Sequence, residues 1–497
     1  MPASFIAVDL GAESGRVMLG SLDTGKLELS EAHRFANVPV QVGNSLYWDI
    51  LRLYGDVTNG LTRVGQEQGK AVASIGIDGW GVDFGLLGAD GELLGNPRHY
   101  RDHRTDGMLE AAFARAPREE IFAATGIQFM QINTLYQLLA MARGRSASLA
   151  AARTFLMVPD LLNYWLTGRA VAEFTNATTT QMLDYRGGWA TTLLDRLGIP
   201  THILPSIALP GTLLGDLRVS VVAETGLRGV PVVAPATHDT GSAVAAIPLT
   251  GHNAAYVSSG TWSIVGVEVE QPIITAASLQ QNFTNEGGVN GTFRYSKNVM
   301  GLWLLQECRR AWARSGASST YEELLASAED APPFVALVDP DAPGLLNPSN
   351  MPVALARRCA ETGQPLPPGP PALTRCILES LALKYRHVLE AIAAVRGTAA
   401  TVVHVVGGGS RNRLLCQMAA NATGCRVVAG PVEATAAGNV LVQAISTGHL
   451  ASLADGRRLI RDSFNLETYE PADSAAWEQA YQRFKALLAL GAARPGR

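Results

Sequence analysis

The stretch FIAVDLGAESGRVMLGSL, residues 5–22, predicts two short strands joined by a tight glycine turn. A third strand with alternating apolar and polar residues is expected after a hairpin turn. The glycine turn leads into a strand rather than a helix, and no Gly-Lys-Ser/Thr follows it. The stretch is therefore neither a dinucleotide fingerprint nor a Walker A loop. The predicted meander consists of strands at 5–10, 16–22 and 27–35, with turns at 11–15 and 23–26.

The turn after Asp9 has the composition of a phosphate-binding nest. Gly11 and Gly15 allow backbone N–H groups to converge on one concavity, and Ser14 and Arg16 add side-chain donors. Asp9, at the end of the strand, is placed to hold a magnesium ion through water. For this turn taken alone, an ordinary hairpin with a charged rim remains the alternative.

A second strand, glycine turn and strand pattern, at 254–268, echoes the first. Ser259 and Gly260 form the turn, and Thr261 offers a hydroxyl group. Two such turns, one at the head of each half, favour a nucleotide that lies between two domains of related architecture. We expect an N-terminal domain at 1–248, a C-terminal domain at 249–455 and a C-terminal extension with a helix at 456–497.

Strands and helices alternate along the rest of the chain, so the predicted fold class is α/β. The Pro-rich segment 365–371 is expected to be a loop. The main expected helices are 50–66, 134–142, 159–166, 412–422 and 474–490, with a small-residue helix from 241; the expected strands are 72–77, 230–234, 401–406 and 427–429.

Composition excludes several classes of protein. The chain has 497 residues, of which 47% are hydrophobic and 17% charged, which excludes intrinsic disorder. The formal net charge, 40 − 44 = −4, excludes a globally basic nucleic-acid binder. No secretory n-region and no membrane-length apolar run is present, which predicts a cytoplasmic protein without a membrane partner. Five cysteines without a C-x-x-C argue against a disulfide scaffold and against zinc, and leave a Cys359–Cys376 bridge open.

The segment Thr237-His238-Asp239-Thr240 lies where a buried strand is expected to meet a helix. Aspartate is a favoured N-cap residue, and a carboxylate at a helix N-terminus stays ionised, as a general base must. The two interpretations of Asp239 are compatible. His238 is either a hydrogen-bond partner of a substrate hydroxyl or a buried, satisfied histidine.

Two further segments suggest ligand contacts. Gly407 to Gly409, between a strand and a helix, permit close approach of a base or ribose, with a plain β-to-α turn as the alternative. The loop at 78–83 combines an aromatic ring with two acids, as sugar sites do, with a β-turn around one buried tryptophan as the alternative. Residues 99–102 and Asn298 are weaker polar candidates.

Taken together, these motifs resemble the FGGY family of carbohydrate kinases. The motifs that carry the resemblance are DLGAESGR (9–16), GIDGWGVDFG (76–85), THDTGSAV (237–244), SSGTWS (258–263) and VVGGGSRN (405–412). They occur in the family's order and span nearly the whole chain. The segments YRDHRTDGM, TGIQFMQINTLYQL, TNATTTQMLDY, NEGG and KNVMGLWLLQECR resemble the branch of the family that acts on L-rhamnulose.

The resemblance implies two ribonuclease H-like (actin-like ATPase) domains that flank a deep cleft. It also implies ATP and Mg²⁺ as cofactors, a small sugar as substrate, and transfer of the γ-phosphate to the 1-hydroxyl of L-rhamnulose. Asp239 matches the catalytic base, and Asp9 is the expected metal ligand. Glu13 stands where the family commonly has small hydroxyl residues, so we expect its backbone N–H to matter more than its side chain. The matched nucleotide contacts are Ala12, Glu13, Ser14, Gly15, Arg16, Thr261, Gln306 and Gly408, and the matched sugar contacts are Gly81, His238, Asp239, Thr240 and Asn298.

Two other functions stay open on the sequence alone. One is a kinase of the same fold for another ketose or polyol, such as L-fuculose or xylulose. The other is a non-catalytic, actin-like sugar sensor that binds nucleotide without phosphoryl transfer. We expect no nucleic-acid partner, and a monomer or weak homodimer.

Overall fold

The computed structural model describes residues 3–23, 25–68, 72–249, 251, 253–317 and 319–492. These residues form two compact units, each assembled from several segments of the chain. Unit 1 comprises Met1–Pro248, Glu268–Tyr295 and Ala434–Phe464; unit 2 comprises Leu249–Val267, Ser296–Glu433 and Asn465–Arg497.

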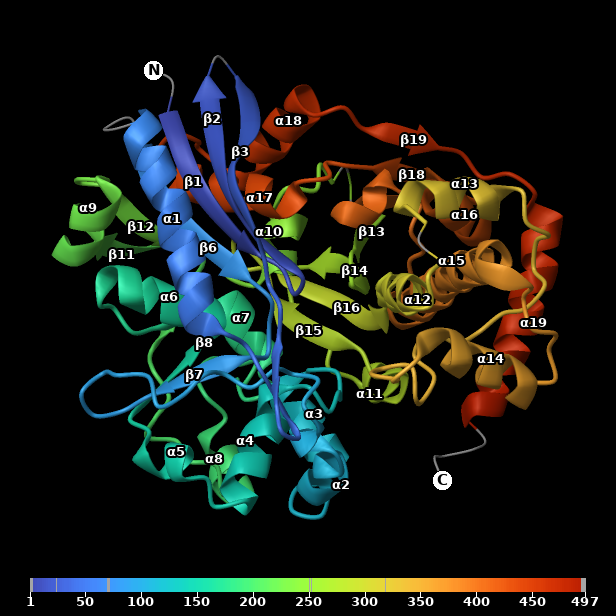
Figure 1. The fold of residues 1–497 in the computed structure, drawn as a ribbon, viewed down its shortest axis with the longest axis horizontal. Helices are drawn as coiled ribbons and strands as arrows, with labels where there is room; N and C mark the ends of the chain where they lie inside the picture. The colour runs from blue at the N-terminus through green and yellow to red at the C-terminus, as the bar shows by residue number, and fades with distance from the viewer. Residues whose placement is uncertain are drawn as a thin grey trace. The chain divides into compact units, whose positions relative to one another are not determined.

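The first sheet has six strands in the order β11-β12-β6-β1-β2-β3 (Figure 1). β1 pairs antiparallel with β2 and parallel with β6, which confirms the predicted opening meander. The register sets Asp9 directly beside Asp78, because both residues lie at the ends of parallel strands. The strands are β1 (Ala3–Leu10), β2 (Ser14–Asp23), β3 (Lys26–Ala36), β6 (Val72–Gly79), β11 (Thr212–Asp216) and β12 (Pro231–Ala234).

Helices cover both faces of this sheet. On β2, a side chain added at Gly20 would meet Val440 of α17 (Ala434–Ser446), whereas Val17 packs close to Gly60 of α1 (Ile50–Gln68). Residues three apart on a strand point to opposite faces, so α17 and α1 cover opposite sides of the sheet (Figure 1).

The other helices of unit 1 are mostly short. They are α2 (Met108–Phe113), α3 (Arg118–Thr125), α4 (Thr134–Arg143), α5 (Ala147–Ala151), α6 (Val158–Thr167), α7 (Phe174–Thr179), α8 (Thr191–Leu197), α9 (Val219–Thr225), α10 (Asp239–Ala245), α11 (Ala276–Gln281) and α18 (Leu453–Ser463). Its short strands are β4 (Val40–Val42), β5 (Ser45–Tyr47), β7 (Phe84–Leu87), β8 (Thr154–Met157), β9 (Ala172–Glu173) and β10 (Ile207–Ala208).

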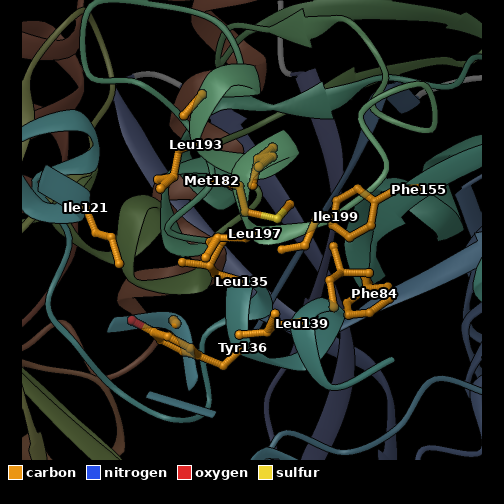
Figure 2. Close-up of a cluster of buried hydrophobic side chains, with 14 of the residues drawn as sticks. Phe84, Ile121, Leu135, Tyr136, Leu139, Phe155, Met182, Leu193, Leu197 and Ile199 are labelled. Carbon is orange, nitrogen blue, oxygen red and sulfur yellow. The ribbon is translucent and has the colours of Figure 1, made fainter. Parts of the chain in front are cut away.

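A hydrophobic cluster fills the α-rich part of unit 1 (Figure 2). Phe84 and Phe155 come from the β7–β8 hairpin, whereas Leu135 and Leu139 come from α4, and all four are buried. Polar Gln137, on the same helix α4, bonds back to the loop that precedes β7. The cluster therefore fixes the helix that holds this loop.

The second sheet repeats the topology of the first. Its order is β15-β16-β14-β13-β17-β18-β19, and β13 pairs antiparallel with β14 and parallel with β17. The echo predicted between the two halves is confirmed, because each sheet has a hairpin beside a parallel strand. The strands are β13 (Ala254–Ser259), β14 (Trp262–Val269), β15 (Thr284–Gly287), β16 (Phe293–Met300), β17 (Val402–Val406), β18 (Arg426–Ala429) and β19 (Glu467–Tyr469).

The helices of unit 2 include the 28-residue α15. The predicted end of the loop at 365–371 is wrong, because α15 already begins at Gly369. The first turn of α15 accommodates two prolines. Cys359 and Cys376 are buried free thiols, so the open bridge is not formed. The helices are α12 (Trp303–Arg314), α13 (Tyr321–Glu329), α14 (Met351–Glu361), α15 (Gly369–Arg396), α16 (Arg413–Thr423) and α19 (Ser474–Ala492).

Candidate active site

Asn37 forms two hydrogen bonds to the glycine turn between β1 and β2. The Gly11 N–H donates to Ser14 O at 2.9 Å and closes the turn. The Asn37 side chain donates to Gly11 O at 3.0 Å, and its N–H donates to Glu13 O at 3.0 Å. Two carbonyls of the turn are thus fixed by one buried residue. Nothing in the sequence marks Asn37, because it lies outside the motif and reaches the turn only through the β2–β3 pairing.

Asp9 and Asp78 bring two carboxylates together at the ends of β1 and β6. Arg16 forms an ion pair with Asp9 at 2.5 Å. Asp78 is fully buried; Oδ2 accepts from Asn439 of α17 at 2.5 Å, and Oδ1 has no hydrogen-bond partner among the described residues. Burial raises the pKa of Asp78 well above its usual value, and the charges of Asp9 and Asp239 raise it further.

This pair fits a hydrated magnesium ion. Mg²⁺ commonly binds one or two carboxylates and completes its octahedron with water and phosphate oxygens. Asp9 and the unpartnered oxygen of Asp78 supply that donor set, and the mutual repulsion of the acids would be relieved by a cation. The described residues contain no group of three or more His, Cys, Asp or Glu arranged to hold a metal by protein ligands alone.

Asp239 is the first residue of α10. The N-cap is His238, so the N-cap prediction for Asp239 is wrong by one residue: its own backbone is already helical. Its Oδ1 accepts from the N–H of Thr240 at 2.5 Å and from the Thr240 hydroxyl at 3.1 Å. The side chain remains 30% exposed. Asp239 is therefore a held carboxylate that a ligand can still reach.

The segment that leads into α10 rests on a buried carboxylate, Glu173. Its side chain accepts from the N–H of Thr237 at 2.9 Å and the Thr237 hydroxyl at 2.8 Å. It also accepts from Thr175, whose hydroxyl in turn accepts from the His238 N–H at 3.2 Å. Burial raises the pKa of Glu173, whereas these hydrogen bonds lower it. Glu173 thus fixes the backbone just before Asp239, and sequence reasoning missed it because it lies 64 residues upstream of Thr237.

The loop after β6 is strained beside Gly81. Val82 has φ 67°, which is unfavourable for a β-branched residue. Thr179 accepts from its N–H at 3.1 Å, and Thr134 donates to its carbonyl at 2.6 Å. A Cβ at Gly81 would lie 2.9 Å from the Thr179 hydroxyl, so this position has no room for a larger residue. Backbone strain of this kind is typical of ligand sites.

In this loop, the side chains of Trp80 and Asp83 are buried and contact other residues of the protein. Trp80 is 5% exposed and packs against Trp48 with ring centroids 4.4 Å apart. Both indole N–H groups donate to Asp83, at 2.6 Å from Trp48 and 3.1 Å from Trp80. The interpretation of Trp80 as a stacking platform and Asp83 as a sugar ligand is therefore wrong. His99 belongs to the predicted polar segment 99–102, and its ring stacks on Trp48. Burial lowers the pKa of His99 to about 3.

In unit 2, the β13–β14 turn is packed against the start of α12. The N–H groups of Gly301 and Trp303 donate to Thr261 O at 3.1 and 3.2 Å. A Cβ at Gly301 would lie 2.6 Å from Trp262 C, so only glycine allows this approach. One turn further along α12, Gln306 Oε1 is buried without a hydrogen-bond partner among the described residues. An orphan acceptor of this kind suits a ligand donor.

The triple glycine has a separate role at each position. Gly407 has φ +80°, and a Cβ at Gly409 would lie 2.0 Å from the hydroxyl of Ser259. A Cβ at Gly408 would meet nothing within 4 Å. Gly407 and Gly409 are therefore required by the fold, while the backbone of Gly408 borders open space.

Asn298, another residue predicted to contact the sugar, lies half-buried on β16.

Two family models match the chain. Residues 4–246 match the N-terminal domain, and residues 255–447 the C-terminal domain, of the FGGY family of carbohydrate kinases. The chain belongs to this family. A protein named rhamnulokinase from Bacteroides thetaiotaomicron is 48% identical over 486 residues, covering 98% of this chain and 99% of that protein. Another rhamnulokinase, from Pectobacterium atrosepticum, is 42% identical over 97% of this chain and 96% of its own length.

Solved structures of other small-molecule kinases share the fold. Gluconate kinase from Lactobacillus acidophilus superposes with a TM-score of 0.80 at 18% identity, covering 99% of both chains. Glycerol kinase from Plasmodium falciparum, solved with ADP, gives 0.77 at 14% identity and 98% coverage of both chains. These likenesses confirm the predicted ribonuclease H-like fold class.

Within the described part of the chain, no helix has both the length and the apolar character needed to span a membrane.

Proposed function

We propose that this FGGY kinase transfers the γ-phosphate of ATP to the 1-hydroxyl of L-rhamnulose, giving L-rhamnulose 1-phosphate and ADP. The sugar is supported by the two rhamnulokinases, which match along nearly the whole chain at 48% and 42% identity. The chemistry is supported by the reachable carboxylate of Asp239, which Thr240 holds and whose charge raises the pKa of Asp78. That carboxylate is the observation on which the proposal rests.

In this proposal the two halves have different tasks. Residues 1–248 carry the base, the first phosphate turn and most sugar contacts, whereas residues 249–455 carry the second phosphate turn and the nucleoside loop. We further propose a cytoplasmic protein that is a monomer or weak homodimer. The nucleotide contacts are Ala12, Glu13, Ser14, Gly15, Arg16, Thr261, Gln306 and Gly408; the sugar contacts are Gly81, His238, Asp239, Thr240 and Asn298.

Asp239 acts as general base. It accepts the proton of the sugar hydroxyl while that oxygen attacks the γ-phosphorus in line with the leaving ADP oxygen. The two hydrogen bonds from Thr240 converge on Oδ1 and orient the carboxylate. Backbone donors of the β1–β2 glycine turn bind phosphate oxygens and stabilise the charge that develops there. Positioning and charge stabilisation thus supply most of the catalysis.

Asp9, with Asp78 beside it, would hold the magnesium ion that this chemistry requires. When bound, the ion supplies positive charge that neutralises the phosphate oxygens. Arg16, which forms an ion pair with Asp9, keeps this acid oriented at the end of β1.

The variant Asp239→Asn tests the base. Asparagine keeps an oxygen for Thr240 but cannot accept the proton, so kcat should fall by about 10²–10⁴. Asp455→Asn is a matched control, because Asp455 is also a first-turn helix acid of unit 1, on α18. Kinase activity is measured by coupled ADP release with L-rhamnulose. A kcat for Asp239→Asn within about tenfold of wild type would show that this carboxylate is not the base.

A sugar panel tests the substrate. L-Rhamnulose, L-fuculose and xylulose are incubated with ATP, and the sugar phosphates are detected by mass. We expect the highest kcat/KM for L-rhamnulose. Preference for another sugar supports the broader ketose or polyol kinase, and absence of any sugar phosphate supports the non-catalytic sensor.

A further inference from the structure

His238 is enclosed by a buried ion pair that the proposed mechanism does not use. Its Nδ1 lies 2.9 Å from Nη2 of Arg294 and 3.3 Å from Oε2 of Glu286. The same Nη2 lies 3.1 Å from Oε2 of Glu286. Arg294 is 0% exposed and Glu286 is 3% exposed. A fully buried arginine is rare and must be paired with an acid, as it is here.

The chemistry of the guanidinium assigns the proton on the imidazole ring. Arginine has five N–H donors and no acceptor, and it stays protonated in proteins. At 2.9 Å, Nη2 therefore donates to His238, so Nδ1 must present its lone pair. The second hydrogen on Nη2 is available to Glu286, and the Arg294 Nε–H donates to Gly287 O at 2.9 Å.

The opposite tautomer places two donors against each other. A hydrogen on Nδ1 would point into the N–H of Arg294 across the same 2.9 Å contact. Among the described residues, Glu286 could compensate at 3.3 Å, but its Oε2 already forms an ion pair with Arg294. A neutral ring with its hydrogen on Nε2 removes this clash, because Nδ1 then accepts the hydrogen bond from Arg294 Nη2.

We infer that Arg294 and Glu286 are positioning residues that fix the tautomer of His238. The Nε2 atom lies 3.5 Å from Oδ1 of Asp239, so its hydrogen is on the side of the base. His238 then offers a donor, and not a lone pair, to the sugar oxygen that lies beside Asp239. This inference rests on the proposed function for the identity of that oxygen, but the tautomer itself does not depend on any substrate.

The tautomer is measured directly by ¹⁵N NMR of protein labelled at histidine, without sugar or ATP. The His238→Gln variant assigns the signals. We expect a protonated Nε2 and an unprotonated Nδ1. A ring protonated at Nδ1, or at both nitrogens, would overturn the inference.

Variants then test whether the two residues set this state. Arg294→Lys keeps the charge but loses the planar fork. The double variant Arg294→Met with Glu286→Gln removes both charges, so neither is left buried and unpaired. We expect both to lose the Nε2–H preference and to lower kcat by about 10–100-fold, by analogy with the loss of the partner that orients a metal-bound histidine. The KM for ATP should stay within twofold of wild type.

Arg457→Lys is the matched control. Arg457 forms a partly buried ion pair with Glu268 at 2.9 Å and donates to Val244 O near the end of α10. It should change neither the tautomer nor kcat. Loss of kcat with an unchanged tautomer in the Arg294 variants would reduce the cluster to a packing role and refute the inference, as would a changed tautomer with normal kcat. If wild-type protein phosphorylates no sugar, the proposed function fails, whereas the ¹⁵N result still decides the tautomer.

Discussion

A side chain at Gly438 should force apart the contact between α10 and α17. A Cβ built there would lie 1.8 Å from the carbonyl oxygen of Ser242 on α10. Ordinary contact for a Cβ begins near 3.4 Å, so Gly438→Ala requires a separation of 3.4 − 1.8 = 1.6 Å between rigid backbones. Both helices carry site residues, since α10 begins with Asp239 and Asn439 of α17 bonds to Asp78.

The same substitution in α1 provides the control. A Cβ at Gly55 would meet nothing within 4 Å. Replacing a helical glycine by alanine gains about 1 kcal/mol, and overpacking against backbone costs up to about 3 kcal/mol. Gly438→Ala should therefore destabilise unit 1 by about 3 − 1 = 2 kcal/mol, whereas Gly55→Ala should stabilise it by about 1 kcal/mol.

Thermal unfolding followed by calorimetry distinguishes the two variants. About 2 kcal/mol corresponds to a Tm lower by roughly 4–8 °C for Gly438→Ala. Its kcat/KM should fall by about 10²-fold, because a shift of about 1 Å at a catalytic group has that effect. Gly55→Ala should raise Tm and leave kcat/KM unchanged. A Gly438→Ala protein with wild-type Tm and activity would refute the close-packing argument.

Two further predictions concern the loops. Asn37→Ala removes the side-chain hydrogen bond to Gly11 O, so the KM for ATP should rise several-fold with little change in kcat. A change in kcat as large as the change in KM would contradict this. Burial raises the pKa of Asp83 to about 6 from 3.8, so its contribution to stability is complete below 3.8 and lost as pH rises through 6. Between pH 5 and 7.5, the Tm of Asp83→Asn should therefore fall less than the Tm of wild type. An equal fall of Tm in both proteins would contradict this.

The strands around the two glycine turns were predictable because their information is local. Short apolar runs bounded by glycine define β1, β2, β13 and β14, and the structure places these strands within one or two residues of the prediction. The strand-to-helix junction at Asp239 was also predictable, since it consists of a buried strand followed by small residues. The error of one residue at its N-cap reflects the limit of boundary prediction.

The supporting residues could not be found in this way. Glu173 reaches Thr237 across 64 positions, and Arg294 reaches His238 across 56. Glu173 lies on β9 and Arg294 on β16, and no local pattern of the sequence records which distant segment each strand meets. The sequence by itself determined the class of fold and the strands on either side of the two glycine turns. Only the tertiary structure brought Glu173 to Thr237 and Arg294 to His238, because a hydrogen bond between distant segments exists only once the chain has folded.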